Sequence, residues 1–170
     1  MIKKALFLDK DGIINHDFGY VHKPESTIYI NGLENILRLA SNNDYLKIIV
    51  TNQAGIGRGY YSELEFKNYM QWLKDDLIAK FKYTFDVYFY CPHHPIKGLG
   101  KYLKNCECRK PGSLMFENAI KEFKINPVKS IMIGDNPTDI IPAKKVGIKK
   151  LFLLNNNESY DGAININYLS

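Results

Sequence analysis

The chain has few cysteines, no long apolar run and no concentrated block of one charge. Its three cysteines among 170 residues are an odd number, which argues against a disulfide framework. No apolar run approaches the ~20 residues that a membrane-spanning helix needs. The apolar segment 5–8 is too short for a signal peptide, and Asp9 and Asp11 follow it at once. These absences lead us to expect a cytoplasmic protein with no membrane partner.

The distribution of charge restricts the class of ligand. The formal net charge is +5, but the lysines are scattered along the chain. There is no run of about five or six basic residues of the kind that binds polyanions, so we expect no nucleic-acid partner. A phosphorylated small molecule suits the modest positive excess. Because no exposed apolar stripe is evident, we also expect a monomer.

Apolar runs alternate with amphipathic runs along the whole length, which is the signature of βαβ units and a parallel sheet. We predict strands near residues 4–9, 46–51, 85–90, 130–134 and 149–154, and helices near residues 33–42, 62–80, 113–124 and 138–146. The expected fold class is α/β, a Rossmann-like parallel sheet flanked by helices. Residues 1–170 fit one domain, and the intervals between motifs leave no room for a large cap domain.

The first predicted strand ends in Asp9-Lys10-Asp11-Gly12. Side chains alternate along a strand, so Asp9 and Asp11 point the same way, at the edge where open α/β sheets bind their ligands. A divalent cation would relieve the repulsion between two such carboxylates. One of them can then act as a nucleophile and the other can carry protons. A strand that simply runs into an Asp/Gly turn is the alternative.

Polar residues also follow two other predicted strands. Thr51 and Asn52 end the second strand, and Gly134-Asp135 ends the fourth, with Asp139 one helical turn later. Taken singly, each of these residues is compatible with a turn or a helix cap, and Lys110 is compatible with a solvated surface charge. Jointly they place carboxylates, a hydroxyl and a cation at one sheet edge, which suits Mg²⁺ and phosphate.

This ordered set of motifs resembles the four motifs of the haloacid dehalogenase (HAD) superfamily of phosphatases, over residues 5–154. The resemblance implies that Asp9 forms an aspartyl-phosphate and that Asp11 is the general acid and base. Thr51 and Lys110 would hold the phosphoryl oxygens. Asp9, the backbone carbonyl of Asp11, and Asp135 would bind Mg²⁺. Asp139 would be a supporting residue that orients its neighbours.

All three cysteines lie in a loop at about 91–108, the longest stretch without periodicity. Three thiols and one imidazole are the ligand set of a structural, four-coordinate zinc ion, which has no open position for catalysis. Three free cysteines are the alternative, and His94 competes with His93 as the fourth ligand. The zinc ligands that we predict are Cys91, His93, Cys106 and Cys108.

The cysteine loop is similar to that of a zinc-loop subgroup of the superfamily, which contains heptose bisphosphate phosphatases and histidinol-phosphate phosphatases. Segments 15–22 and 51–59 resemble the heptose enzymes more closely. This resemblance implies removal of the 7-phosphate of a heptose 1,7-bisphosphate on the route to a nucleotide-activated heptose. Arg109 would bind the second phosphate, Asn52 the sugar or a phosphate, and Arg58 would shape the entrance.

Two alternatives to this function remain open at the level of sequence. One is a histidinol-phosphate phosphatase with the same mechanism, and the other is a zinc-stabilised binding module without catalysis. The chain also departs from the heptose enzymes at Asn136, where they carry a lysine, and in a shorter segment after Pro111. With no cap domain expected, the zinc loop and the segment 15–30 would form a partial wall around the site.

Overall fold

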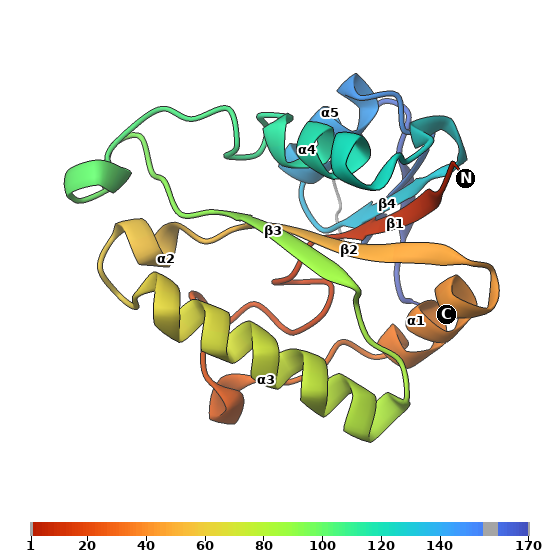
Figure 1. Ribbon diagram of the computed structural model, residues 1–170, viewed down its shortest axis with the longest axis horizontal. Helices are drawn as coiled ribbons and strands as arrows, with labels where there is room; N and C mark the ends of the chain where they lie inside the picture. The colour runs from red at the N-terminus through yellow and green to blue at the C-terminus, as the bar shows by residue number, and fades with distance from the viewer. Residues whose placement is uncertain (1, 155–159, 170) are drawn as a thin grey trace.

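The computed structural model describes residues 2–154 and 160–169. Its centre is a parallel six-stranded sheet with the strand order β3-β2-β1-β4-β5-β6 (Figure 1). This is the order of a doubly wound, Rossmann-type sheet, in which the direction of winding reverses between β1 and β4. The strands are β1 (Lys4–Leu8), β2 (Tyr45–Asn52), β3 (Val87–Cys91), β4 (Ile131–Gly134), β5 (Lys150–Leu154) and β6 (Ile164–Ile166).

Helices cover both faces of the sheet. Figure 1 shows α1 and α3 on one side and α4 and α5 on the other. The β1 sequence explains this arrangement, because Leu6 and Leu8 enter the core beneath α1 and α3, whereas Ala5 and Phe7 enter the core beneath α4 and α5. The helices are α1 (Leu33–Asn42), α2 (Ala54–Gly57), α3 (Glu63–Phe81), α4 (Leu114–Phe123) and α5 (Pro137–Lys145).

The predicted helices agree with the structure to within one residue at each end, and the five predicted strands to within two. Ser62 and Glu65 form the expected capping box at the start of α3. Among the described residues, one short α-helix (α2), one short strand (β6) and three single-turn 3-10 helices were not predicted. The four residues of α2 include two glycines, and the three of β6 are too few to show a periodic pattern.

The register of the strands determines which residues meet at the carboxyl edge. Leu8 of β1 pairs with Ile49 of β2 and with Ile133 of β4, so the residues that follow these strands lie side by side. Asn52 of β2 pairs with Cys91 of β3. The motifs at the ends of β1, β2 and β4 therefore share one edge with the start of the cysteine loop. In Figure 1 this loop extends beside α2 before the chain returns to α4.

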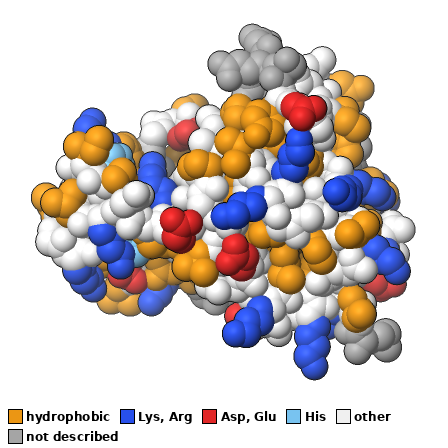
Figure 2. All heavy atoms as spheres, turned by 90° about the horizontal axis from the view of Figure 1, so that it is seen from above, with side chains coloured by type: hydrophobic (Ala, Val, Ile, Leu, Met, Phe, Trp, Pro, Cys, Tyr) orange, Lys and Arg blue, Asp and Glu red, His pale blue; other side chains and the backbone are white. Residues whose placement is uncertain are grey.

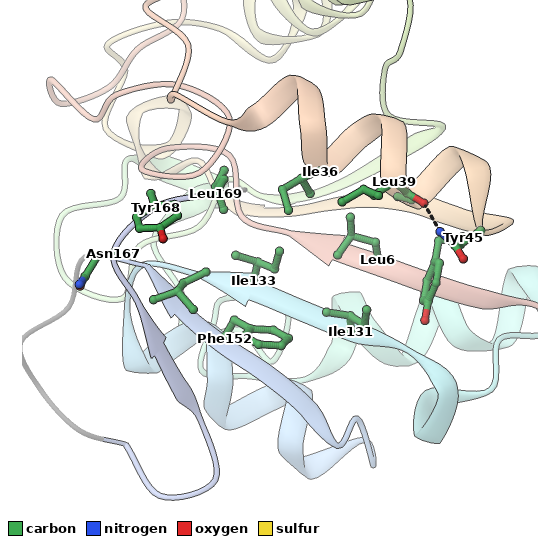
Figure 3. Close-up of a pocket in the computed structure, with 13 residues that line it drawn as sticks. Leu6, Ile36, Leu39, Tyr45, Ile131, Ile133, Phe152, Asn167, Tyr168 and Leu169 are labelled. Carbon is green, nitrogen blue, oxygen red and sulfur yellow. Dashed lines mark hydrogen bonds between the residues drawn. The ribbon is translucent and has the colours of Figure 1, made fainter.

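An apolar groove of about 700 Å³ lies on the α1 side of the sheet (Figure 3). Leu6, Ile133 and Phe152 form its floor, while Leu39 and Tyr168 lie on its sides. Of the described residues that line this groove, none also lines the polar pocket at the carboxyl edge of the sheet.

The surface carries charges of both signs. Figure 2 shows lysine and arginine side chains scattered over one face, among acidic and apolar ones. Among the described residues, no helix is both long enough and apolar enough to cross a membrane.

Candidate active site

A polar pocket of about 450 Å³ opens at the carboxyl edge of the sheet. It lies where β1 and β4 meet, which is the switch point of the strand order. Apart from the four predicted zinc ligands, every site residue predicted from the sequence lines this pocket. These are Asp9, Asp11, Thr51, Asn52, Arg58, Arg109, Lys110, Asp135, Asn136 and Asp139.

Lys110 is the buried cation among the residues that line the pocket, and it is 4% exposed. Its Nζ donates hydrogen bonds to Asp9 Oδ1 at 2.9 Å, to Asp139 Oδ1 at 2.5 Å and to the Val50 carbonyl at 2.8 Å. These three acceptors match the three donors of an ammonium group. Burial alone would lower the pKa of Lys110, but attraction to Asp139 and Asp9 outweighs burial and raises the pKa. The lysine therefore stays charged between the two carboxylates.

Asn52 holds the backbone of Lys110 from the end of β2. The backbone N–H of Lys110 donates to Asn52 Oδ1 at 2.9 Å, and Asn52 Nδ2 donates to the Lys110 carbonyl at 3.1 Å. This pair of hydrogen bonds fixes the loop that carries the lysine. The sequence predicted that Asn52 contacts the substrate. That contact stays a prediction, because both polar atoms of the Asn52 amide already form hydrogen bonds with the backbone of Lys110.

Asp139 both caps the start of α5 and pairs with the charge of Lys110. Its Oδ2 accepts a hydrogen bond from the Asn136 backbone at 3.1 Å, and the Asn136 side chain caps α5 in return. Its Oδ1 accepts from Lys110. Because both oxygens are engaged, the geometry favours Asp139 as an orienting residue over Asp139 as a metal ligand.

Three carboxylates crowd the bottom of the pocket. One oxygen from each of Asp9, Asp135 and Asp139 lies within 4.8 Å of the others. Burial, followed by the charge of Asp139, raises the pKa of Asp135 to about 6. Burial and the same neighbour also raise the pKa of Asp9, although Lys110 opposes the shift. A divalent cation would favour the ionised forms of Asp9 and Asp135.

The backbone at Gly12 is shaped to this cluster. Gly12 has φ +88°, and a Cβ there would lie 2.0 Å from Asp135 Oδ2. Only glycine combines this conformation with such a close approach. The Asp135 carboxylate therefore reaches the turn after β1, next to the backbone of Asp11. This donor set of two carboxylates beside a backbone turn fits Mg²⁺, which prefers oxygen ligands.

The comparisons with known proteins agree with this geometry. A family model described as HAD-hydrolase-like matches residues 107–164. The D-glycero-beta-D-manno-heptose-1,7-bisphosphate 7-phosphatase of Haemophilus ducreyi is 42% identical over 154 residues, covering 91% of this chain and 84% of that protein. The enzyme of the same name from Pasteurella multocida is 40% identical over 170 residues, covering 99% and 91%. The chain belongs to the heptose-1,7-bisphosphate 7-phosphatase family of HAD hydrolases.

The relatives include phosphatases named for the alpha anomer of the heptose bisphosphate as well as for the beta anomer. A D-glycero-alpha-D-manno-heptose-1,7-bisphosphate 7-phosphatase from Photorhabdus laumondii is 41% identical over 155 residues, covering 89% of this chain and 82% of that protein. A crystal structure of D,D-heptose 1,7-bisphosphate phosphatase from B. bronchiseptica, in complex with magnesium and phosphate, has a TM-score of 0.83. It is 23% identical and covers 97% of this chain and 93% of that chain, so it supports the HAD fold.

The cysteine loop of this family member gathers the four residues predicted as zinc ligands. One ligand atom from each of Cys91, His93, Cys106 and Cys108 lies within 4.8 Å of the others. The Sγ atoms of Cys91 and Cys108 are 2.7 Å apart, and Nδ1 of His93 is 3.4 Å from Cys108 Sγ. Burial lowers the pKa of His93, which favours the neutral imidazole that binds metals. The set fits a closed tetrahedral zinc site.

His94 points into a different environment. Its Nδ1 accepts hydrogen bonds from the backbone of Ile96 and Lys97, and it lines the active-site pocket, not the cysteine cluster. Of the two histidines that the sequence offered, the structure therefore places His93 among the thiols and His94 at the pocket.

Cations and aromatic rings form the mouth of the pocket. The Arg58 guanidinium packs over the rings of Tyr20 and Tyr60, and it also donates to the Tyr20 hydroxyl. Arg109 lines the same pocket, and its Nη1 lies 3.4 Å from the carbonyl of His93. The segment 15–30, through Asp17, Gly19 and Tyr20, and the cysteine loop, through His94, thus both contribute to the lining of this pocket. That they form a partial wall around the site stays a prediction.

The sequence analysis did not identify three residues around Asp11. Lys10 is fully buried, and its Nζ donates to Asp11 Oδ1 at 2.5 Å and to the Val21 carbonyl at 2.9 Å. Asn15 also donates to Asp11 Oδ1, at 3.0 Å, and Gln53 donates to Asp11 Oδ2, at 3.2 Å. Lysine, asparagine and glutamine are usually exposed, so their residue types alone give no signal of burial.

Proposed function

We propose that this chain is a Mg²⁺-dependent phosphatase that removes the 7-phosphate of D-glycero-D-manno-heptose 1,7-bisphosphate. The observation that carries the proposal is the position of Lys110 between Asp9 and Asp139, with Asp135 in the same carboxylate cluster. An anionic phosphoryl group needs a nucleophile, a fixed cation and a metal-binding pair of carboxylates in one place. The named relatives support the choice of sugar.

In the first step, a carboxylate oxygen of Asp9 forms a bond to phosphorus while the bond from phosphorus to O7 of the sugar breaks. Asp11 gives a proton to O7, which leaves as an alcohol. In the second step, Asp11 takes a proton from water as the water oxygen bonds to phosphorus. The bond to Asp9 then breaks, which releases inorganic phosphate and restores both carboxyl groups.

Lys110 and Thr51 would hold the phosphoryl oxygens throughout both steps, with Lys110 redirecting to the phosphoryl group the hydrogen bond that it donates to Asp9 in the free enzyme. Asp9, the backbone carbonyl of Asp11, and Asp135 would hold Mg²⁺, which supplies charge neutralisation for the transferring group. Asp139 would keep Lys110 in place through their hydrogen bond. Cys91, His93, Cys106 and Cys108 would bind a structural zinc ion that orders the loop leading to Arg109 and Lys110.

Selection of the bisphosphate would depend on the mouth of the pocket. Arg109 and Arg58 both line it, and a guanidinium binds phosphate through two parallel hydrogen bonds. We assign the 1-phosphate to Arg109. Histidinol phosphate would instead bring its own cation toward these two arginines, so the charge of the pocket disfavours it.

The test is phosphate release in the presence of Mg²⁺ from the α and β anomers of the heptose bisphosphate and from histidinol phosphate. We expect turnover of at least one heptose anomer, with much lower kcat/KM for histidinol phosphate. A preference for histidinol phosphate would overturn the substrate and keep the mechanism. A lack of turnover of all three would favour a zinc-stabilised binding module.

The setting of this reaction follows from its substrate. We place the enzyme in the cytoplasm, where it would supply a heptose 1-phosphate to a reaction that attaches a nucleotide. We also propose that residues 1–170 act as one domain and as a monomer, with no nucleic-acid or membrane partner. Light scattering coupled to size-exclusion chromatography tests the monomer, for which the expected mass is 19.6 kDa.

A further inference from the structure

Gln53 lies at the end of β2, immediately after Thr51 and Asn52, and its side chain is buried against the pocket. It is 2% exposed. Its Nε2 donates hydrogen bonds to Asp11 Oδ2 at 3.2 Å and to Thr51 Oγ1 at 2.9 Å. Its Oε1 accepts a hydrogen bond from the Tyr61 hydroxyl at 2.6 Å. One amide therefore connects the proton-carrying carboxylate with the phosphate-binding hydroxyl.

Asp11 and Tyr61 together determine which way this amide faces, because an ionised carboxylate only accepts hydrogen bonds and the Tyr61 hydroxyl can donate to the amide oxygen. The Tyr61 ring stacks on His22 at 4.2 Å between ring centres, and a Cβ at Gly55 would lie 2.3 Å from it, so packing fixes its position. With Oε1 toward Tyr61, both hydrogens of Nε2 point to Asp11 and Thr51. The reverse orientation would set Oε1 against the Asp11 carboxylate, which is repulsive when that group is ionised.

The orientation of Gln53 has consequences for both partners. Because Thr51 Oγ1 accepts from Gln53, the hydroxyl hydrogen of Thr51 is left to donate to a phosphoryl oxygen. On Asp11, Oδ1 accepts from Lys10 and Asn15, whereas among the side chains of the described residues Oδ2 accepts from Gln53 alone. Oδ2 is therefore the less engaged oxygen of Asp11, and we assign it to face the leaving oxygen of the substrate.

We propose that Gln53 is a positioning residue for Asp11. It holds Oδ2 toward the leaving oxygen, and thereby sets the efficiency of proton transfer to the departing alcohol. The proposal rests on the proposed phosphatase function. It predicts that loss of Gln53 has its largest effect on esters whose leaving group must be protonated, because positioned general acids contribute most to those reactions.

The test compares kcat/KM of wild type and Gln53→Met for three phosphate esters. They are p-nitrophenyl phosphate, phenyl phosphate and the heptose bisphosphate, in order of increasingly basic leaving group. p-Nitrophenolate departs with little help from an acid, so we expect its loss to be small. We expect the loss to increase along the series and to be at least about tenfold greater for the heptose ester than for p-nitrophenyl phosphate.

Two further variants complete the design. Tyr61→Phe removes the hydroxyl that orients the amide and keeps the buried ring, so it should show the same trend with smaller losses. Gln71→Met makes the matched exchange at an exposed position of α3 and should behave as wild type. Within the described part of the chain, the Gln71 side chain hydrogen-bonds to Asp75 alone. Urea unfolding of each variant separates a folding defect from a catalytic one.

The outcomes distinguish this inference from the proposed function. Equal losses for all three esters in both Gln53→Met and Tyr61→Phe would overturn the role of Gln53, because a general structural effect does not depend on the leaving group. If wild type hydrolyses none of the esters, the proposed phosphatase function itself is wrong. If Gln53→Met does not fold, Tyr61→Phe alone carries the comparison.

Discussion

The side-chain nitrogen of Lys110 lies 2.9 Å from Oδ1 of Asp9, a residue 101 positions earlier in the chain. This contact joins the end of the first strand to the segment that follows the cysteine loop. The same nitrogen also binds Asp139 at the start of α5. Three distant parts of the sequence therefore depend on one buried cation, which has consequences for stability as well as for chemistry.

Replacement of Lys110 by methionine should impair both the stability of the fold and the chemistry of the site. The variant keeps much of the side-chain volume but leaves Asp9 and Asp139 buried without their cation. We expect a loss of about 3–5 kcal/mol in the free energy of unfolding, as for other broken buried pairs. Lys144→Met is the control, since Lys144 pairs with the exposed Asp161 and should stay within about 0.5 kcal/mol of wild type. Urea denaturation measures both; an unchanged midpoint for Lys110→Met would contradict the role of this lysine.

Asp9→Asn should abolish phosphate release and leave the fold intact. The amide cannot form the aspartyl-phosphate, and its loss of charge relieves repulsion from Asp135 and Asp139. The expected result is activity at background and a urea midpoint no lower than that of wild type. Asp161→Asn, a neutralisation at an exposed position, serves as the control for charge. Appreciable turnover by Asp9→Asn would rule out Asp9 as the nucleophile.

The stability of the metal-free protein should fall as the pH rises from about 5 to about 7.5. The pKa of Asp135 is about 6 in the folded protein, above its value of roughly 3.9 in an unfolded chain. The folded state therefore binds this proton more tightly, and the resulting stabilisation is lost as the pH rises through the folded pKa. Urea midpoints measured without Mg²⁺ at the two pH values test this expectation.

Two comparisons make this pH effect specific to the carboxylate cluster. Asp135→Asn should show a smaller decline, because the amide does not titrate. Mg²⁺ should stabilise wild type most at the higher pH, where the carboxylates are ionised, and should have little effect on the variant. A decline of equal size in wild type and Asp135→Asn would show that other groups are responsible.

Cys108→Ser should remove the zinc ion and lower stability. Cys108 Sγ lies closest to the other ligands, 2.7 Å from Cys91 Sγ and 2.9 Å from Cys106 Sγ. Elemental analysis should find one zinc per wild-type chain and much less in the variant, with a reduced thermal midpoint. His94→Ala should retain zinc, because His94 lies outside the cluster. Full zinc content in Cys108→Ser would exclude the proposed ligand set.

Arg109→Ala should weaken binding of the bisphosphate in particular. We expect KM for heptose 1,7-bisphosphate to rise by at least about tenfold, which corresponds to 1.4 kcal/mol, the scale of a charge-assisted hydrogen bond. KM for p-nitrophenyl phosphate should change little, because that ester has no second phosphate. Arg38→Ala, on the surface of α1, is the matched control. Equal losses on both substrates would show that Arg109 does not bind the 1-phosphate.

Local pattern in the sequence was sufficient for much of this protein. Alternating apolar residues predicted the parallel sheet and its covering helices, since side-chain periodicity depends only on the backbone of each element. The order of motifs placed Asp9, Thr51 and Asp135 at one edge, because the carboxyl ends of parallel strands necessarily share it. The close grouping of Cys91, His93, Cys106 and Cys108 could also be predicted, because they lie in two short clusters within one loop.

The contacts that give these residues their environment were decided only by tertiary structure. Asn52 holds the backbone of Lys110, and Tyr61 orients Gln53 toward Asp11. Lys10 is buried against the Val21 carbonyl even though lysine is usually exposed. Such contacts depend on strand order, on register and on the path of two loops. None of these produces a periodic pattern in the sequence. The sequence by itself determined which chemical groups reach the site, and packing decided how each one is held and charged.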